Sequence, residues 1–173
     1  ASGFRGLRQY WQELLLLFAL MLPLEAVLPH LIEVATLTAK FATFILWHLG
    51  FDVSRQGINL LLPDGAVAVT PGCSGLSSIV RLLRLTVLVL VLFPTTWPQK
   101  VLLPLVAVGI AFVVNGIRVV VMAIVVTANQ QAFTYWHEGV PARTFSFISI
   151  LIFGLFCHLL LRKNEPQRDL VEL

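Results

Sequence analysis

The chain has 173 residues, which is enough for one domain and short for two. Hydrophobic residues make up 58% of it and charged residues only 12%, where soluble domains carry about 25%. This composition argues against a large soluble core and indicates a protein that resides in the membrane. The net charge of +3 is modest and no basic run with interleaved aromatic residues occurs, so nucleic acid is not an expected partner.

Apolar stretches recur along the chain, and a membrane-spanning helix needs about 20 apolar residues. Four segments meet this requirement: Tyr10–Leu28, Gly75–Phe93, Val101–Val120 and Thr144–Leu161. A fifth, Leu31–Leu49, carries Glu33 and Lys40, so it either spans the membrane or lies in the interface. We therefore predict an all-α polytopic membrane protein with four to six membrane helices. It forms one domain over residues 1–173, with a polar tail at 163–173.

The pattern changes to a β-prone one between Asp52 and Gly72. Two runs, Ile58–Leu62 and Ala66–Thr70, flank a turn signal at Pro63-Asp64-Gly65. We expect a short β-hairpin at the outer membrane face.

Positive residues predict the orientation, because they favour the cytoplasmic side. Basic residues stand near both termini and between two predicted spans: Arg5, Arg8, Lys100, Arg162 and Lys163. If all of these residues face the cytoplasm, four spans place both termini inside, and Leu31–Leu49 is then interfacial or re-entrant. The first span has no cleavage site, so we expect it to be retained. The expected location is the cytoplasmic membrane, with the site facing the periplasm or exterior.

Three candidate catalytic residues, Cys73, Arg118 and His137, are expected at the same outer membrane face. Cys73 lies about 20 residues, or roughly 30 Å, before the turn at Pro94–Lys100, and Arg118 lies about 27 Å after Lys100 along the next helix. Both distances match the thickness of a hydrocarbon core. His137 lies just beyond the outer end of the last span. Val119–Phe133 is too short to cross again, so we interpret it as the top of an over-long helix and a surface excursion. If it crossed, His137 would face the cytoplasm and no common site would form.

Cys73 stands in Pro71–Gly75, where the β-prone run ends and a helix starts. A helix N-terminus stabilises a thiolate, the reactive form of cysteine, through its macrodipole and free N–H groups. The glycines beside it allow a tight turn and close approach of a substrate backbone. The alternative is a small apolar filler, with Ser74 and Ser77 as helix caps.

Arg118 sits among valines, just after Asn115 on the same helical face. An arginine there costs roughly a few kcal/mol unless it is paired or functional, and the alternative is an interfacial snorkelling arginine. His137 is either a solvated loop residue or the general base for a thiol. The other histidines and the second cysteine are assigned structural roles: His30, His48, His158 and Cys157.

Taken in chain order, these motifs resemble those of the exosortase/archaeosortase family. The matching pieces are Cys73-Ser74-Gly75-Leu76 at the head of a helix, Asn115-Gly116-Ile117-Arg118 late in the next, and His137-Glu138-Gly139 before the last span. The resemblance covers about Leu60 to Leu161. Each motif alone is common, whereas the ordered set on this topology is specific.

The resemblance implies a cysteine protease or transpeptidase that acts outside the cytoplasmic membrane. Its substrates would be exported proteins with a C-terminal sorting signal: a short motif such as Pro-Glu-Pro, a membrane helix and a basic tail. It implies Cys73 as nucleophile, His137 as general base and acid, and Arg118 as stabiliser of a thiolate or oxyanion. Membrane lipids and a lipid or amine acceptor are further expected partners, and no cofactor or metal is expected. Few spans precede the cysteine, so the chain looks like a compact core version of the longer members.

Four residues are expected to contact substrate: Arg81, Arg84, Asn115 and Ser74. Arg81 and Arg84 follow Cys73 on one helical face, about 12–16 Å below the thiol. They either pair with Glu25 or Glu33, or bind an acidic residue of the sorting signal or a lipid phosphate.

Two functions of other kinds fit the same residues. One is a non-catalytic membrane scaffold or assembly subunit in which Cys73 is incidental, and the other is a lipid-linked acyltransferase using thioester chemistry. Alkylation separates the first from a thiol enzyme, because a thiolate reacts quickly near neutral pH and an inert buried thiol does not. The acceptor found on the product distinguishes the acyltransferase from the peptidase or transpeptidase.

Overall fold

A computed structural model describes Met21, residues 33–128 and residues 140–162. Within these ranges the chain forms four helices and one small sheet. The helices are α4 (Val34–His48), α5 (Leu76–Leu92), α6 (Trp97–Ala128) and α8 (Val140–Arg162). The strands are β1 (Ser54–Gln56), β2 (Asn59–Leu62) and β3 (Gly65–Ala68).

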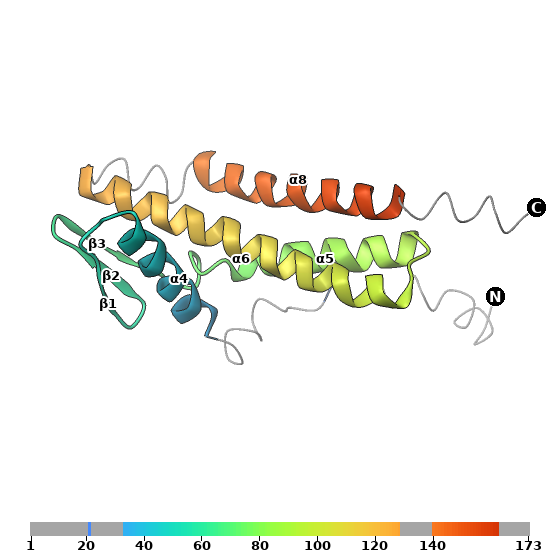
Figure 1. Cartoon of the computed structure of the whole chain (residues 1–173), viewed down its shortest axis with the longest axis horizontal. Coiled ribbons are helices and arrows are strands. Elements are labelled where there is room, and N and C mark those ends of the chain that lie inside the picture. Colours follow the sequence, from blue (N-terminus) through green and yellow to red (C-terminus); the bar gives the residue numbers. More distant parts are fainter. Residues whose placement is uncertain (1–20, 22–32, 129–139, 163–173) are drawn as a thin grey trace, which may run out of the picture.

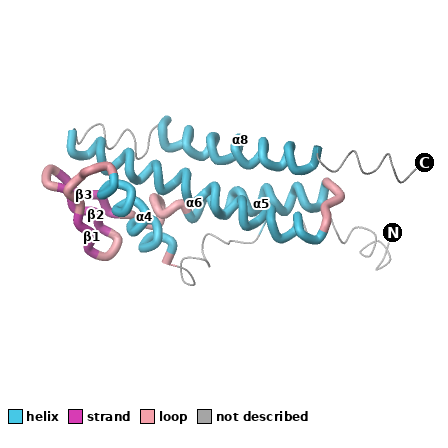
Figure 2. The backbone as a smooth tube through the Cα atoms, viewed as in Figure 1, coloured by secondary structure: helices cyan, strands magenta, loops and turns pink. Residues whose placement is uncertain are grey.

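Helix α6 is the central element, and every other described helix packs against it. Figure 1 shows α5 and α8 lying along α6, while α4 and the sheet gather around its other end. The tube view in Figure 2 separates the same two regions, with all strands at one end of the helices. We name them the bundle (α5, α8 and the first part of α6) and the head (α4, the sheet and Val119–Thr127).

Two buried clusters correspond to these regions. In the head, side chains from α4 and the sheet surround the end of α6, and Cys73 belongs to this cluster together with Val119 and Met122. In the bundle, Leu82 of α5, Leu103 of α6 and Phe153 of α8 form the second cluster. The helical prediction is confirmed for these elements.

The length of α6 explains the apolar segment that fitted no span. Its 32 residues extend about 48 Å, well beyond a hydrocarbon core of about 30 Å. Val119 and Met122 are 0% exposed and Val126 is 7% exposed, because α4 and the sheet cover them. The expected over-long helix is therefore confirmed as far as Ala128. The expected surface excursion lies mostly outside the described residues.

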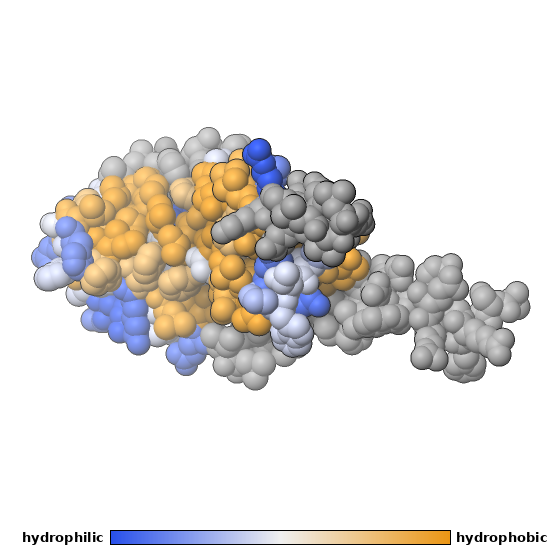
Figure 3. All heavy atoms as spheres, turned by 45° about the vertical axis from the view of Figure 1, so that its right-hand side comes forward, coloured by the Kyte–Doolittle hydropathy of each residue, from blue (hydrophilic) through white to orange (hydrophobic). Residues whose placement is uncertain are grey.

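Two of the described helices are long and apolar enough to cross a membrane, over Trp97–Thr127 and Arg143–Arg162. Along α8, Phe147, Leu151 and Leu155 are 66%, 69% and 60% exposed and recur at helical spacing. An apolar stripe of this size faces lipid more favourably than water. Figure 3 shows hydrophobic side chains covering much of the visible face, with hydrophilic ones toward its margins.

The remaining helices are shorter than the roughly 20 residues of a full span. Helix α5 has 17 residues and matches the predicted Gly75–Phe93 closely. Helix α4 has 15 residues and packs on α6 and the sheet, which fits the interfacial alternative for Leu31–Leu49. The first predicted span, Tyr10–Leu28, lies outside the described residues apart from Met21. The total number of spans therefore stays a prediction.

The predicted hairpin is confirmed, and a third strand extends it. Strand β2 pairs antiparallel with β3 from Asn59↔Ala68 to Leu62↔Gly65, so Pro63 and Asp64 form the turn. Strand β1 pairs antiparallel with β2 on the other side. Leu60, Leu62 and Val67 alternate with more exposed residues and turn their side chains into the head cluster. The sheet therefore covers the part of α6 that leaves the bundle.

Candidate active site

Cys73 lies in the turn that connects β3 to α5, as the sequence predicted. The backbone N–H of Cys73 donates to the Thr70 carbonyl at 2.9 Å, and the Ser74 hydroxyl donates to the Pro71 carbonyl at 2.8 Å. Gly75 is the N-cap of α5, has a φ of +88° and makes no side-chain cap hydrogen bond. Instead, Ser74 Oγ accepts a hydrogen bond from the Leu76 N–H at 3.4 Å. These short-range bonds fix a tight turn directly before the helix.

Two other helices also hold this turn by hydrogen bonds: α4, which precedes it in the chain, and α6, which follows it. The Asn115 side chain on α6 donates from Nδ2 to the Cys73 carbonyl at 2.8 Å. The Thr38 hydroxyl on α4 donates to the Ser74 carbonyl, also at 2.8 Å. Both donors are buried, with Thr38 0% and Asn115 4% exposed. Buried hydrogen bonds of this kind are costly to break, so the position of the thiol depends on α4 and α6 together.

Gly75 is required by this arrangement. A Cβ atom at this position would lie 2.8 Å from the side-chain amide of Asn115, and the positive φ disfavours any other residue. The absence of a side chain lets the turn approach α6 closely enough for the Asn115 hydrogen bond.

Arg118 lies on the face of α6 that carries Asn115. Residues separated by three or four positions share a helical face, which places Arg118 beside Asn115 and close in register to Met122. Asn115 contacts the Cys73 turn and Met122 packs in the cluster that contains Cys73. The Arg118 side chain is half-buried and its Nε atom is buried. The turn and this part of α6 are therefore at one height, as the helical distances predicted.

The other predicted residues divide into three groups. His137 lies outside the described residues, so its position relative to Cys73 stays a prediction. Ser74 and Asn115, expected at the substrate, use their side chains within the turn and hold it in place. Cys157 is buried in the bundle cluster, and His48 is exposed with Nδ1 2.8 Å from the Phe44 carbonyl oxygen. These last two placements agree with structural roles.

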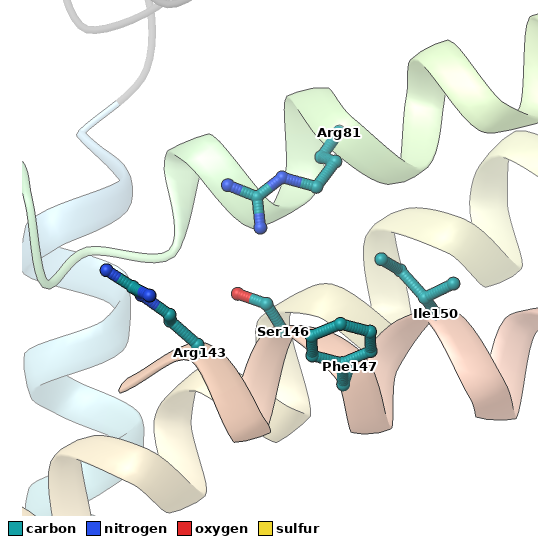
Figure 4. A pocket seen from close by; sticks show the side chains of 5 residues that line it. All are labelled: Arg81, Arg143, Ser146, Phe147 and Ile150. Carbon is teal, nitrogen blue, oxygen red and sulfur yellow. The ribbon is translucent and has the colours of Figure 1, made fainter. Parts of the chain in front are cut away.

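Arg81 and Arg84 differ in their surroundings, although both are on α5. Arg84 is half-buried with a buried Nε atom, whereas Arg81 is exposed. Arg81 lines a cleft between α5 and α8, opposite Arg143, Ser146, Phe147 and Ile150 (Figure 4). That Arg143 and Arg81 line the same cleft was not predicted from the sequence, because no local pattern relates residues on these two helices.

Thr38 is the other functional candidate that the sequence analysis missed. A threonine within an apolar helix gives no local signal, and its partner Ser74 is 36 residues away. As for metals, residues 33–128 and 140–162 bring together no group of three or more His, Cys, Asp or Glu side chains.

These observations describe a membrane protein in which the turn before α5 presents a buried cysteine at the head of that helix. The family model described as transmembrane exosortase matches residues 1–154, and the chain belongs to that family. The resemblance found from the three motifs is thereby confirmed. Comparisons with curated proteins and with solved structures give no match.

Proposed function

We propose that the chain is a membrane cysteine peptidase or transpeptidase that cleaves C-terminal sorting signals of exported proteins. The observation that supports this most directly is the Cys73 turn, which Asn115 and Thr38 hold from two helices. A nucleophile must be held in a defined geometry to react efficiently, and these two hydrogen bonds fix the backbone that carries the thiol. Membership of the exosortase family supports the same assignment.

In the proposed reaction His137 accepts the proton of the Cys73 thiol, and the thiolate attacks the scissile carbonyl carbon. The new C–S bond forms as the carbonyl π electrons move to oxygen, and Arg118 stabilises this oxyanion by charge and hydrogen bonding. When the intermediate collapses, the C–N bond breaks, and His137 donates a proton to the leaving amine. A thioester on Cys73 remains.

Water or an acceptor amine then attacks the thioester carbonyl. His137 removes a proton from the attacking group, the C–S bond breaks, and the Cys73 thiolate is regenerated. Water gives a hydrolysed product, and an amine, free or carried on a lipid, gives a transfer product.

The first turn of α5 suits the thiolate required for this cycle. The first N–H groups of a helix have no partner within the helix, and the macrodipole adds partial positive charge there. Cys73 stands shortly before the N-cap Gly75, so its backbone lies next to this end of α5. This placement supports a reactive thiol at the head of the helix.

Substitution of Cys73 tests the proposal. We expect Cys73→Ala to abolish cleavage of a peptide that contains a Pro-Glu-Pro motif, a membrane helix and a basic tail. Cys157→Ala is the matched control, since it removes a buried thiol of the bundle cluster and should leave the rate within about twofold of wild type. Unimpaired cleavage by folded Cys73→Ala protein would exclude a cysteine enzyme.

A non-catalytic scaffold is the second candidate, and the burial of the thiol favours it. Cys73 is 1% exposed and packs within the head cluster, as a structural cysteine would. Alkylation by iodoacetamide near neutral pH distinguishes the two. We expect Cys73 to react faster than Cys157 in the native protein, whereas a scaffold would leave both thiols unreactive until unfolding.

A further inference from the structure

A cleft with a volume of about 390 Å³ lies between α5 and α8, separate from the Cys73 turn. Arg81 lines it from α5, and Arg143, Ser146, Phe147 and Ile150 line it from α8. In Figure 4 both guanidinium groups and the Ser146 hydroxyl point into the space between the two helices. The cleft therefore presents a cation from each helix, together with a hydroxyl and two apolar side chains from α8.

The charges of the cleft favour an anionic ligand. Its described lining residues include two arginines and no carboxylate. Like charges that face each other across a space of reduced dielectric repel, and an anion between them removes this repulsion. Guanidinium groups bind phosphate oxygens through parallel N–H donors, and a serine hydroxyl can donate to a further oxygen. A phosphate group, with several acceptor oxygens, matches this set.

The depth of the cleft corresponds to the lipid headgroups. Arg143 and Arg162 mark the two ends of a 20-residue apolar segment of α8. This segment extends about 30 Å, the thickness of a hydrocarbon core, so the two arginines lie at opposite membrane interfaces. Arg81 lines the same cleft as Arg143, which places both guanidinium groups at one interface.

The apolar wall of the cleft, formed by Phe147 and Ile150, continues onto the lipid-facing side of α8. Phe147 is 66% exposed and Leu151, one turn further along, is 69% exposed. A ligand held between Arg81 and Arg143 can thus extend an acyl chain along Phe147 and Ile150 toward the bilayer interior. A soluble acidic peptide has no group that would use this wall.

We propose that this cleft binds the phosphodiester headgroup of an anionic phospholipid, with Arg81, Arg143 and Ser146 as its ligands. The site is independent of the peptidase assignment, because none of its residues takes part in the proposed reaction. Its bound lipid connects the outer end of α8 to α5 at the membrane surface.

Binding of dioleoyl-phosphatidylglycerol to the purified full-length chain in neutral detergent tests the proposal, with dioleoylglycerol as the uncharged comparison. We expect clear preference for phosphatidylglycerol. Arg81→Gln and Arg143→Gln should each weaken it by about fivefold, the effect of losing one interfacial cation. Arg143→Lys should retain most of the binding because the charge remains. Arg162→Gln, which removes a cation from the opposite end of α8, is the matched control and should have little effect.

Three results would overturn the proposal. Equal losses in Arg162→Gln and Arg143→Gln would show diffuse surface attraction instead of a site. Displacement of phosphatidylglycerol by millimolar inorganic phosphate would show that a free anion suffices. Binding of a soluble glutamate-containing peptide that Arg143→Gln abolishes, without preference between the two lipids, would assign the cleft to a peptide. All measurements use the Cys73→Ala variant as well, so a failure of the lipid site is distinguishable from a failure of the peptidase assignment.

Discussion

Arg118 is half-buried on the face of α6 that carries Asn115, and its role determines whether the site is catalytic. Arg118→Lys keeps the positive charge and can still extend toward the interface, but it loses the planar fork that holds an oxyanion. We expect turnover of a sorting-signal peptide to fall by at least about tenfold, some 1.4 kcal/mol of transition-state stabilisation.

The comparison requires equal amounts of folded wild type and variant. A snorkelling anchor would tolerate lysine, so equal rates for the two proteins would return Arg118 to that role.

Asn115 and Thr38 should act as positioning residues for the nucleophile. Asn115→Ala and Thr38→Val each leave a carbonyl of the Cys73 turn without its buried donor, at a cost of about 1–3 kcal/mol in stability. We also expect slower cleavage and a changed alkylation rate at Cys73, because the thiol is no longer held in one geometry.

Thr86→Val provides the control, since Thr86 is buried and its hydroxyl donates to the Leu82 carbonyl within α5. It removes a similar hydrogen bond away from the turn. If Thr38→Val and Thr86→Val lowered stability alike and left the alkylation rate of Cys73 unchanged, the hydrogen bonds would be structural only.

At the scale of the elements, the close contact between α4 and α6 depends on Gly116. A Cβ atom at Gly116 would overlap the ring of Phe41, which also stacks near Phe112 with ring centroids 5.3 Å apart. We expect Gly116→Ala to lower the free energy of unfolding in detergent by about 1–3 kcal/mol, as overpacking does. Gly109→Ala on the same helix should be neutral or stabilising, because nothing lies within 4 Å of its Cβ position.

The double variant Gly116→Ala with Phe41→Ala makes space for the new methyl group. Its loss of stability should be smaller than the sum of the two single losses. Additive effects would mean that α4 and α6 do not touch at this point.

The bundle helices were predictable from sequence because apolar length is a strong signal for a membrane helix. The continuation of α6 beyond the span Val101–Val120 was predicted, but its end at Ala128 and the elements that cover it were not. Val119–Thr127 is covered by α4 and the sheet, and a segment covered by protein is as apolar as one covered by lipid. Strand β1 was also missed, because Ser54–Gln56 is polar and lies at the edge of the sheet.

The candidate site was predictable only in part, for a similar reason. Cys73 and Arg118 could be found because a thiol at a helix start and an arginine among valines are locally unusual. The Thr38 hydrogen bond and the cleft shared by Arg81 and Arg143 depend on how the helices pack, which leaves no trace in a single sequence.

At the scale of the whole molecule, the orientation in the membrane remains a proposal, with the head outside the cytoplasm. Cys73 is 1% exposed and an impermeant maleimide is larger than iodoacetamide, so introduced surface cysteines report the orientation better. In a Cys73→Ala, Cys157→Ala background, an impermeant maleimide added to intact cells should label Asp64→Cys in the β2–β3 turn. Lys100→Cys in the first turn of α6 should react only after the inner face is opened, since both native residues are exposed at opposite ends of the molecule. The reverse pattern would place the head in the cytoplasm.

Helix α6 also links the Cys73 turn to the bilayer itself. A helix longer than the hydrocarbon thickness accommodates by tilting, and the tilt decreases as the membrane thickens. The Asn115 hydrogen bond ties the Cys73 turn to α6, and the Thr38 hydrogen bond ties it to α4. A change in the tilt of α6 would therefore move one support of the turn relative to the other, so we expect lipid chain length to alter the geometry of the Cys73 turn.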